Sequence, residues 1–334
     1  MKAIVWTAYG PPEVLELRQV EKPTPKANEV LIRVYATTVT AGDCEMRSLR
    51  FPFYFSLIMR LWRGLLKPRG TAILGTELAG EIEAVGRDVK RFKEGDQVFG
   101  SASLNLGANA EYICLLAEPG EMEGGVATKP ANMTYAEAAT VPFGGRDALH
   151  FLRKADIQSG QRVLINGAGG SIGVFAVQLA KHFGAEVAAV DSAAKLDMLR
   201  ALGADQVFDY TREDFTDSGE VYDVIFDVVG TVSFSRSARA ITRDGTYLLA
   251  NPMRSQMLSG PWARLTGSRR VIMETASGTV DDLVYLRELV EAGELRTVID
   301  RAYPLEGIVE AHRYVETGRK QGNVVITVGH DQRP

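Results

Sequence analysis

The chain has 334 residues, of which 46% are hydrophobic and 24% are charged. This length exceeds what one hydrophobic core usually serves, and the composition is that of an ordinary globular protein, so we expect two domains. The formal net charge is -4 and the charges are spread along the chain, which argues against nucleic acid as a partner. Cys44 and Cys114 are too few for a disulfide framework and fit a reducing compartment.

The N-terminal part of the chain favours β structure. Its first residues, MKAIVWTAYGPPEV, have neither a long apolar region nor an Arg-rich, acid-free character, so we expect a cytoplasmic protein. Up to residue 126, short runs such as EVLIRVYATTV and AGEIEAVG are separated by Gly, Pro and Asp turns. These runs predict a first domain rich in β-strands.

One segment of this first part, FPFYFSLIMRLWRGLLKPR (residues 51–69), is crowded with apolar side chains and carries only positive charge. Arg60 and Arg63 interrupt the apolar run, which is therefore far short of the ~20 residues of a membrane span. One interpretation is a helical insert that packs on its own domain and lines the mouth of a substrate site. The other is a basic amphipathic patch that makes a peripheral contact with an anionic membrane or a partner.

After about residue 150, strand-like runs alternate with helix-like runs in units of about 25 to 30 residues, as in RVLIN, SIGVFAVQLAKHFG and EVAAVD. This alternation predicts βαβ crossovers and an α/β domain with a doubly wound parallel sheet. From about residue 278, a helix-like and two strand-like runs close the chain and are expected to return to the first domain. We therefore predict one domain from residues 1–126 and 278–334, and a second from residues 127–277.

The stretch VLINGAGGSIGVFAVQLAK places a glycine-rich turn between the first strand and the first helix of the predicted parallel sheet. Glycines allow a tight turn there and let the backbone approach a pyrophosphate, while the start of the helix offers free N–H groups. The spacing is G-x-x-G-x-x-G rather than G-x-G-x-x-G. The residues that we expect to contact the pyrophosphate are Gly167, Ala168, Gly169, Gly170, Ser171, Ile172 and Gly173.

A glycine turn alone also fits a plain structural turn. Asp191, at the end of the next strand, lies 18 residues past Gly173, close to the ~20 expected of an acid that binds a ribose. The strand before the turn, the helix after it and this acid together favour a dinucleotide site.

Longer motifs resemble one family. GEIEAVGRDVKRFKEGDQVFG, NAEYI, KPANMTYAEAATVPFGG and LRALGADQVFDYTREDF follow one another in the order found in the medium-chain dehydrogenases/reductases, in the branch of the zinc-free quinone oxidoreductases and the reticulon-interacting mitochondrial oxidoreductases. The resemblance covers nearly the whole chain. It implies a GroES-like, β-rich substrate domain and a Rossmann domain, and a protein that forms homodimers or tetramers.

The resemblance also identifies the positions at which zinc-dependent relatives have metal ligands. These positions hold Thr40, Thr76 and Phe143, none of which provides the thiolate, imidazole or carboxylate that zinc sites use in those places. We therefore expect no metal. Without a Lewis acid, hydride transfer to a quinone, an enone or a similar small electrophile is more plausible than alcohol oxidation.

The loop TVTAGDCEMR contains the candidate catalytic residues. Thr40 is the most plausible hydrogen-bond donor to a substrate oxygen. Asp43 and Arg47, four residues apart on a predicted helix, form either a bracing pair for that donor or a structural salt bridge. Cys44 is expected to be a buried, unreactive thiol rather than a nucleophile.

The identity of the cofactor, NADH or NADPH, is left open by the sequence. Asp191 is expected to accept hydrogen bonds from the ribose hydroxyls of NAD and to repel the 2′-phosphate of NADP. Lys195 and Tyr210, however, match a lysine and a tyrosine that bind this phosphate in related NADPH-dependent reductases, and Ser192 can join them. Lys195 is alternatively a solvated residue of the following helix. The resemblance also places Val229, Gly230 and Asn251 at strand ends beside the nicotinamide.

Three functions remain after this reading. The first is a zinc-independent NAD(P)H-dependent reductase of quinones or enones. The second is an alcohol dehydrogenase-like enzyme, and the third is a nucleotide-binding protein with little turnover.

Overall fold

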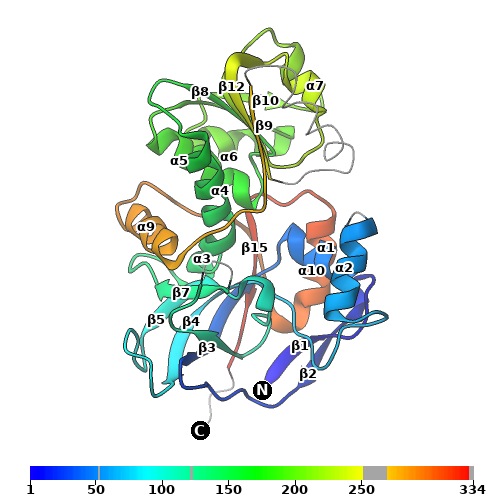
Figure 1. Ribbon diagram of the computed structural model, residues 1–334, viewed down its shortest axis with the longest axis vertical. Helices are drawn as coiled ribbons and strands as arrows, with labels where there is room; N and C mark the ends of the chain where they lie inside the picture. Colours follow the sequence, from blue (N-terminus) through cyan, green and yellow to red (C-terminus); the bar gives the residue numbers. More distant parts are fainter. Residues whose placement is uncertain (52, 121–122, 251–268, 331–334) are drawn as a thin grey trace. The chain divides into compact units, whose positions relative to one another are not determined.

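The first structural unit consists largely of the strands that the N-terminal runs predict. In the computed structural model, which describes residues 1–51, 53–120, 123–250 and 269–330, this unit comprises Met1–Phe143, Thr279–Glu291 and Thr297–Pro334 (Figure 1). A small antiparallel pair is formed by β1 (Lys2–Trp6) and β2 (Leu15–Gln19). The larger sheet has the order β14 (Ile299–Pro304), β15 (Asn323–Thr327), β3 (Glu29–Thr38), β4 (Glu77–Val85), β5 (Gln97–Ser101) and β7 (Gly125–Thr128), and β6 (Tyr112–Leu116) also pairs with β3.

Strands from both ends of the chain share the core of this unit. β15 pairs antiparallel with β3, although their sequences lie almost 300 residues apart, so the C-terminal segment returns to the first unit as expected. Ile4, Ile32, Leu78 and Ile326 are fully buried or nearly so in one hydrophobic cluster. The helices of this unit are α1 (Ala41–Ser48), α2 (Phe53–Arg63), α3 (Tyr135–Ala138), α9 (Val280–Glu291) and α10 (Ile308–Glu316), with short 3-10 turns η1 (Pro12–Val14), η2 (Ser103–Asn105) and η5 (Leu305–Gly307).

The second unit, Gly144–Gly278 with Ala292–Arg296, has a parallel sheet. Its described strands follow the order β10 (Gln206–Asp209), β9 (Glu186–Asp191), β8 (Arg162–Asn166), β11 (Tyr222–Asp227), β12 (Ile241–Leu249) and β13 (Arg270–Met273). Every pairing is parallel. The helices and 3-10 turns among its described residues are α5 (Ser171–His182), η3 (Ala193–Lys195), α6 (Leu196–Ala201), η4 (Phe215–Asp217) and α7 (Phe234–Ser237), and α4 (Val141–Ala155) begins in the first unit and continues into this one.

The strand order of this sheet positions a binding site. Counted along the sheet's own strands, the order is 3-2-1-4-5-6, the order of the doubly wound dinucleotide-binding fold, in which ligands bind at the carboxyl ends of the strands where the winding direction reverses. The reversal lies between β8 and β11, which are neighbours. The expected α/β class, a Rossmann sheet together with a β-rich GroES-like unit, is confirmed.

The boundaries between the units differ in detail from the expected ones. The expected boundary between residues 126 and 127 falls inside β7, which is hydrogen-bonded to β5, and α3 packs on β3 and β4. The first unit therefore extends to Phe143. Ala292–Arg296 joins the second unit, where the Gln178 side chain donates to the carbonyl of Arg296 at 2.9 Å and accepts from its N–H at 2.9 Å.

Candidate functional site

The glycine turn connects β8 to α5 as the sequence predicts, and its glycines have different structural roles. Gly167 has φ +82°, a left-handed conformation that favours glycine, and a Cβ there would lie 2.4 Å from Cγ2 of Val229. A Cβ on Gly173 would lie 2.4 Å from the Gly167 carbonyl oxygen. Gly173 therefore allows the helix to approach the turn closely.

Gly170 leaves room for a side chain. It is the N-cap of α5 in extended backbone and provides no side-chain cap, and a Cβ there would meet only the Gly167 oxygen, at 3.6 Å. The N–H groups of a first helical turn have no partners within the helix, and the helix dipole makes this end positive. The start of α5 is therefore electrostatically suited to an anionic group.

Asp191 holds the turn from the neighbouring strand. Its Oδ2 accepts a hydrogen bond from the N–H of Gly169 at 2.8 Å, and its Oδ1 accepts from the N–H of Ser192 at 2.8 Å. Asp191 is only 6% exposed. Its carboxylate therefore does two things at once, because it fixes the glycine turn and presents negative charge at the carboxyl end of β9.

Lys195 forms an ion pair with this carboxylate. Its Nζ lies 3.0 Å from Asp191 Oδ1, and the residue is 7% exposed. The alternative that Lys195 is a solvated residue of the following helix is therefore wrong. Tyr210 reaches the same strand end, because its N–H donates to the carbonyl of Asp191 at 3.2 Å, and its side chain is 62% exposed.

Asp191, which favours NAD, and Lys195, which favours NADP, are therefore in direct contact. An acid that accepts from ribose hydroxyls and a lysine that attracts a phosphate neutralise each other. Lysine Nζ has three hydrogens, so its ion pair with Asp191 leaves it able to donate to a further acceptor.

A second polar network lies at the neighbouring strand ends, and sequence reasoning missed it. Asp227, which is 1% exposed at the end of β11, accepts from Asn166 Nδ2 at 2.9 Å, from the Gly230 N–H at 2.8 Å and from the Tyr247 hydroxyl at 2.8 Å. Burial raises the pKa of Asp227, and these hydrogen bonds oppose the shift. The network fixes the turn that carries Val229 and Gly230.

A signal for this network was present in the sequence. Asn166 and Asp227 each end a strand of the predicted parallel sheet, and β8 and β11 pair directly at these residues. Polar residues at the carboxyl ends of adjacent parallel strands meet at one edge of the sheet. Asn251, the third residue expected beside the nicotinamide, lies outside the described residues.

Thr40 and Asp43, the predicted catalytic residues, form the start of α1 in the first unit. The Thr40 hydroxyl accepts from the Asp43 N–H at 3.1 Å and donates to Asp43 Oδ2 at 2.7 Å, which in turn accepts from the Thr40 N–H at 2.8 Å. This is a capping box. Both residues are nearly fully buried, and burial raises the pKa of Asp43 to about 6 against the hydrogen bonds from Thr40. Their catalytic role stays a prediction.

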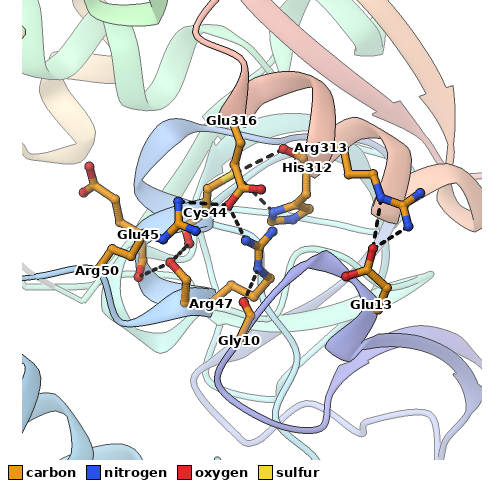
Figure 2. Close-up of polar contacts among 10 residues, drawn as sticks. Gly10, Glu13, Cys44, Glu45, Arg47, Arg50, His312, Arg313 and Glu316 are labelled. Atoms are coloured by element: carbon orange, nitrogen blue, oxygen red, sulfur yellow. Dashed lines mark hydrogen bonds and ion pairs between the residues drawn. The ribbon is translucent and has the colours of Figure 1, made fainter.

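Arg47 does not pair with Asp43, so the expected ion pair between them is wrong. Figure 2 shows the guanidinium of Arg47 directed at Glu316 on α10, 2.5 Å from its Oε1, and at the carbonyl of Gly10, to which Nε donates at 3.1 Å. The reason is tertiary, because α10 packs against α1 and brings Glu316 to a fully buried arginine side chain. A buried guanidinium requires such a partner.

Cys44 is buried beside α10, as expected for an unreactive thiol. Its Sγ lies 3.3 Å from Nδ1 of His312 (Figure 2), and burial raises the pKa of the thiol to about 12 and lowers that of His312 to about 3. Both groups are therefore neutral at physiological pH, and the thiolate that nucleophilic chemistry requires is disfavoured.

The positions that hold zinc ligands in the zinc-dependent relatives have other contacts here. Glu77, which follows Thr76, accepts a hydrogen bond from the Phe143 N–H at 2.6 Å and from the Thr38 hydroxyl at 2.5 Å. Among the described residues, no three His, Cys, Asp or Glu side chains are grouped so that they could hold a metal ion.

If Thr40 acts chiefly as a helix cap, loss of its hydroxyl is expected to lower the free energy of unfolding more than it lowers turnover. Thr40→Ala should lower the free energy of unfolding by about 1 to 2 kcal/mol, because the N-cap acceptor is lost and Asp43 Oδ2 loses a donor. Thr40→Ser, which keeps the hydroxyl, should change stability by less. Urea unfolding measures both, and the kcat of the folded Thr40→Ala variant reveals any additional role as a donor to substrate.

Comparison with known proteins agrees with this geometry. Residues 26–145 match the alcohol dehydrogenase GroES-like domain, and residues 202–326 match the zinc-binding dehydrogenase domain. The chain is 35% identical to the 2-methylene-furan-3-one reductase of Solanum lycopersicum and 33% identical to the chloroplastic NADPH-dependent alkenal/one oxidoreductase of Arabidopsis thaliana, over 98% of this chain and 79% of each relative. The solved structure of the quinone oxidoreductase from Coxiella burnetii matches with a TM-score of 0.86 and 28% identity, over 98% of this chain and 99% of that one. The chain belongs to the medium-chain dehydrogenase/reductase family, together with quinone oxidoreductases and alkenal reductases.

Proposed function

We propose that this protein is an NAD(P)H-dependent reductase that transfers a hydride to a small quinone, enone or similar carbonyl-conjugated electrophile. The observation that carries the proposal is the glycine turn at the start of α5 in the second unit, with the ion pair of Asp191 and Lys195 against Gly169. The names of the relatives support the reaction class, since one is a furanone reductase and another acts on alkenals and alkenones with NADPH.

The residues of the chain fit a nicotinamide dinucleotide. The start of α5 would hold the pyrophosphate, and Ser192, Lys195 and Tyr210 would contact the adenosine ribose or its 2′-phosphate. Val229 and Gly230, fixed by Asp227, would lie against the nicotinamide. When bound, the reduced nicotinamide supplies the hydride, and a proton from solvent or from a side chain completes the reduction.

We propose dual use of NADH and NADPH. The Asp191 carboxylate can accept from ribose hydroxyls, and the Lys195 ammonium can donate to a 2′-phosphate without leaving its buried position. Because the two charges offset each other, neither cofactor meets a strongly repulsive site. Thr40 remains the candidate donor to the substrate oxygen within this proposal.

We also propose that catalysis is independent of zinc, that the protein is cytoplasmic and that it forms a homodimer. Zinc-independent catalysis is supported by Thr40, Thr76 and Phe143 at the ligand positions of the zinc-dependent relatives. A cytoplasmic location is supported by the two free cysteines, which suit a reducing compartment. A homodimer is supported by β13, which in the described residues pairs on one side only and so leaves a sheet edge for a second copy.

Steady-state assays distinguish the three candidate functions. Purified protein is expected to oxidise NADH and NADPH when an enone or a quinone is added, and to give no reduction of NAD or NADP with primary alcohols. Alcohol-dependent reduction of the cofactor would favour an alcohol dehydrogenase. Cofactor binding without turnover of any acceptor would favour a nucleotide-binding protein.

A further inference from the structure

The helix α2 exposes an apolar surface that the proposed reaction does not use. We define the α2 face as Leu57, Ile58, Leu61, Trp62, Leu65 and Leu66, which are 43, 56, 61, 49, 58 and 85% exposed. The first four lie at spacings of one, three and four residues on α2, and the last two follow its end. These are six of the eleven large apolar side chains that are exposed in the described part of the chain. Such a concentration marks an interaction surface.

The segment that carries this face is positively charged. Arg60, Arg63, Lys67 and Arg69 lie within it or beside it in sequence, and residues 51–76 contain no acidic residue. The guanidinium of Arg63 lies 4.1 Å from the ring of Trp62, and that of Arg60 lies 4.9 Å from the ring of Tyr9. Among the described residues, no carboxylate forms an ion pair with any of these four cations, whereas the chain as a whole has a formal net charge of -4.

A cavity opens beside the face within the same unit. It has a volume of about 360 Å³, within the range of small-ligand pockets. Trp6, Trp62, Arg63, Arg69 and Asn105 contribute to its lining. The Nε of Arg63 is buried without a hydrogen-bond partner among the described residues. The lining therefore combines two tryptophans with two arginines, one of which, Arg63, also donates from Nη2 to the carbonyl of Leu104. This composition suits a phosphate attached to an apolar body.

We propose that the α2 face docks on the surface of a bilayer that contains anionic phospholipid, with a lipid phosphate in the cavity beside Arg63 and Arg69. The eleven residues of α2 are too few to cross a bilayer, which takes about 20, so the helix lies in the interface with its apolar side chains toward the acyl chains. None of the described helices combines the length and the apolar character that crossing a membrane requires.

Charge decides between a lipid surface and a second copy of the chain. A two-fold dimer through the α2 face would place the same surface on both sides, so Arg60, Arg63, Lys67 and Arg69 would face identical cations. An anionic bilayer offers the opposite sign. The acidic remainder of the chain is repelled by such a bilayer and so favours approach through this face.

Vesicle flotation with the full chain tests the proposal. The protein should associate with phosphatidylcholine vesicles that contain phosphatidylglycerol at least about tenfold more than with phosphatidylcholine alone, and salt should weaken this association. The fluorescence of Trp62 should shift to the blue on binding, and Trp62→Phe should remove the shift.

Matched variants separate the parts of the surface. Leu65→Ser with Leu66→Ser, and separately Arg63→Gln with Arg69→Gln, should each lower vesicle association at least about tenfold. Val221→Ser, at an apolar side chain of the second unit that is 45% exposed, should leave it unchanged. Cofactor oxidation without vesicles should be the same in all these variants, which shows that they are folded.

Three results would overturn the proposal. The first is equal association with neutral and anionic vesicles, and the second is association that neither pair of substitutions alters. The third is a solution dimer that Leu65→Ser with Leu66→Ser dissociates while anionic vesicles bind no protein, which would assign the face to a second copy of the chain.

Discussion

Gly170→Asp is expected to abolish dinucleotide binding in a protein that remains fully folded. The residue is an extended N-cap, and a Cβ there would meet only the Gly167 oxygen, at an ordinary contact distance of 3.6 Å, so an aspartate fits without a clash. Aspartate is among the best N-cap residues, and its carboxylate should accept from an N–H of the first turn of α5. The free energy of unfolding should therefore stay the same or rise by a few tenths of a kcal/mol. The affinity for NADH and NADPH should fall at least about 100-fold, because the new charge takes the place of a pyrophosphate and repels it.

Two neighbouring substitutions serve as controls for this expectation. Gly170→Asn caps the helix without a charge, so the difference between Asn and Asp isolates the electrostatic part of the loss. Gly173→Ala should instead unfold or distort the second unit, because its methyl group would overlap the backbone of Gly167 and Ala168. Urea unfolding and cofactor fluorescence titration measure the two effects. Wild-type affinity in Gly170→Asp would show that the dinucleotide binds elsewhere.

The second large effect is expected at the ion pair between Asp191 and Lys195. Asp191→Asn should lower the free energy of unfolding by about 2 to 4 kcal/mol, because it leaves a buried ammonium without its counter-ion. The same substitution should shift the preference at least about tenfold toward NADPH, since it leaves the positive charge of Lys195 without a counter-ion and free to bind the 2′-phosphate.

Lys195→Met is expected to shift the cofactor preference away from NADPH, opposite to the shift in Asp191→Asn. NADPH affinity should fall while NADH affinity changes little, because only NADPH carries the phosphate that the ammonium attracts. The double variant should recover part of the stability that Asp191→Asn loses, which a double-mutant cycle measures as a coupling energy. An unchanged ratio of NADH to NADPH affinity in both single variants would remove these two residues from cofactor recognition.

Local pattern was enough to predict the elements that form the cofactor site. The glycine spacing, the strand before it and the acid after it identified β8, α5 and the end of β9, because each signal lies within about 30 residues of the next. The position of Lys195 was also predicted, but not its contact with Asp191. Asp191 ends a strand, where side chains four residues apart do not normally meet. The two charges come together because the backbone forms the 3-10 turn η3 directly after the strand.

Contacts between distant segments could not be read from the sequence. Arg47 was expected to pair with Asp43 at helical spacing, yet it pairs with Glu316, 269 residues away, because α10 docks on α1. The roles of Thr40 and Asp43 illustrate a different limit. Their spacing, T-x-x-D before a helix, is also that of a capping box. Local chemistry alone does not say whether a hydroxyl caps a helix, contacts a substrate or does both.

Transfer of deuterium from the cofactor to an enone tests whether this protein is a hydride-transferring reductase. With NADPH or NADH deuterated at the transferable position of nicotinamide C4, and an enone as acceptor, we expect one deuterium on the carbon β to the carbonyl of the product and a solvent proton on the α carbon. Gly170→Asp should give no labelled product. Deuterium on the carbonyl carbon would instead reveal carbonyl reduction to an alcohol. Tight cofactor binding with an unlabelled, unreacted enone would contradict the assignment as a reductase of this substrate class.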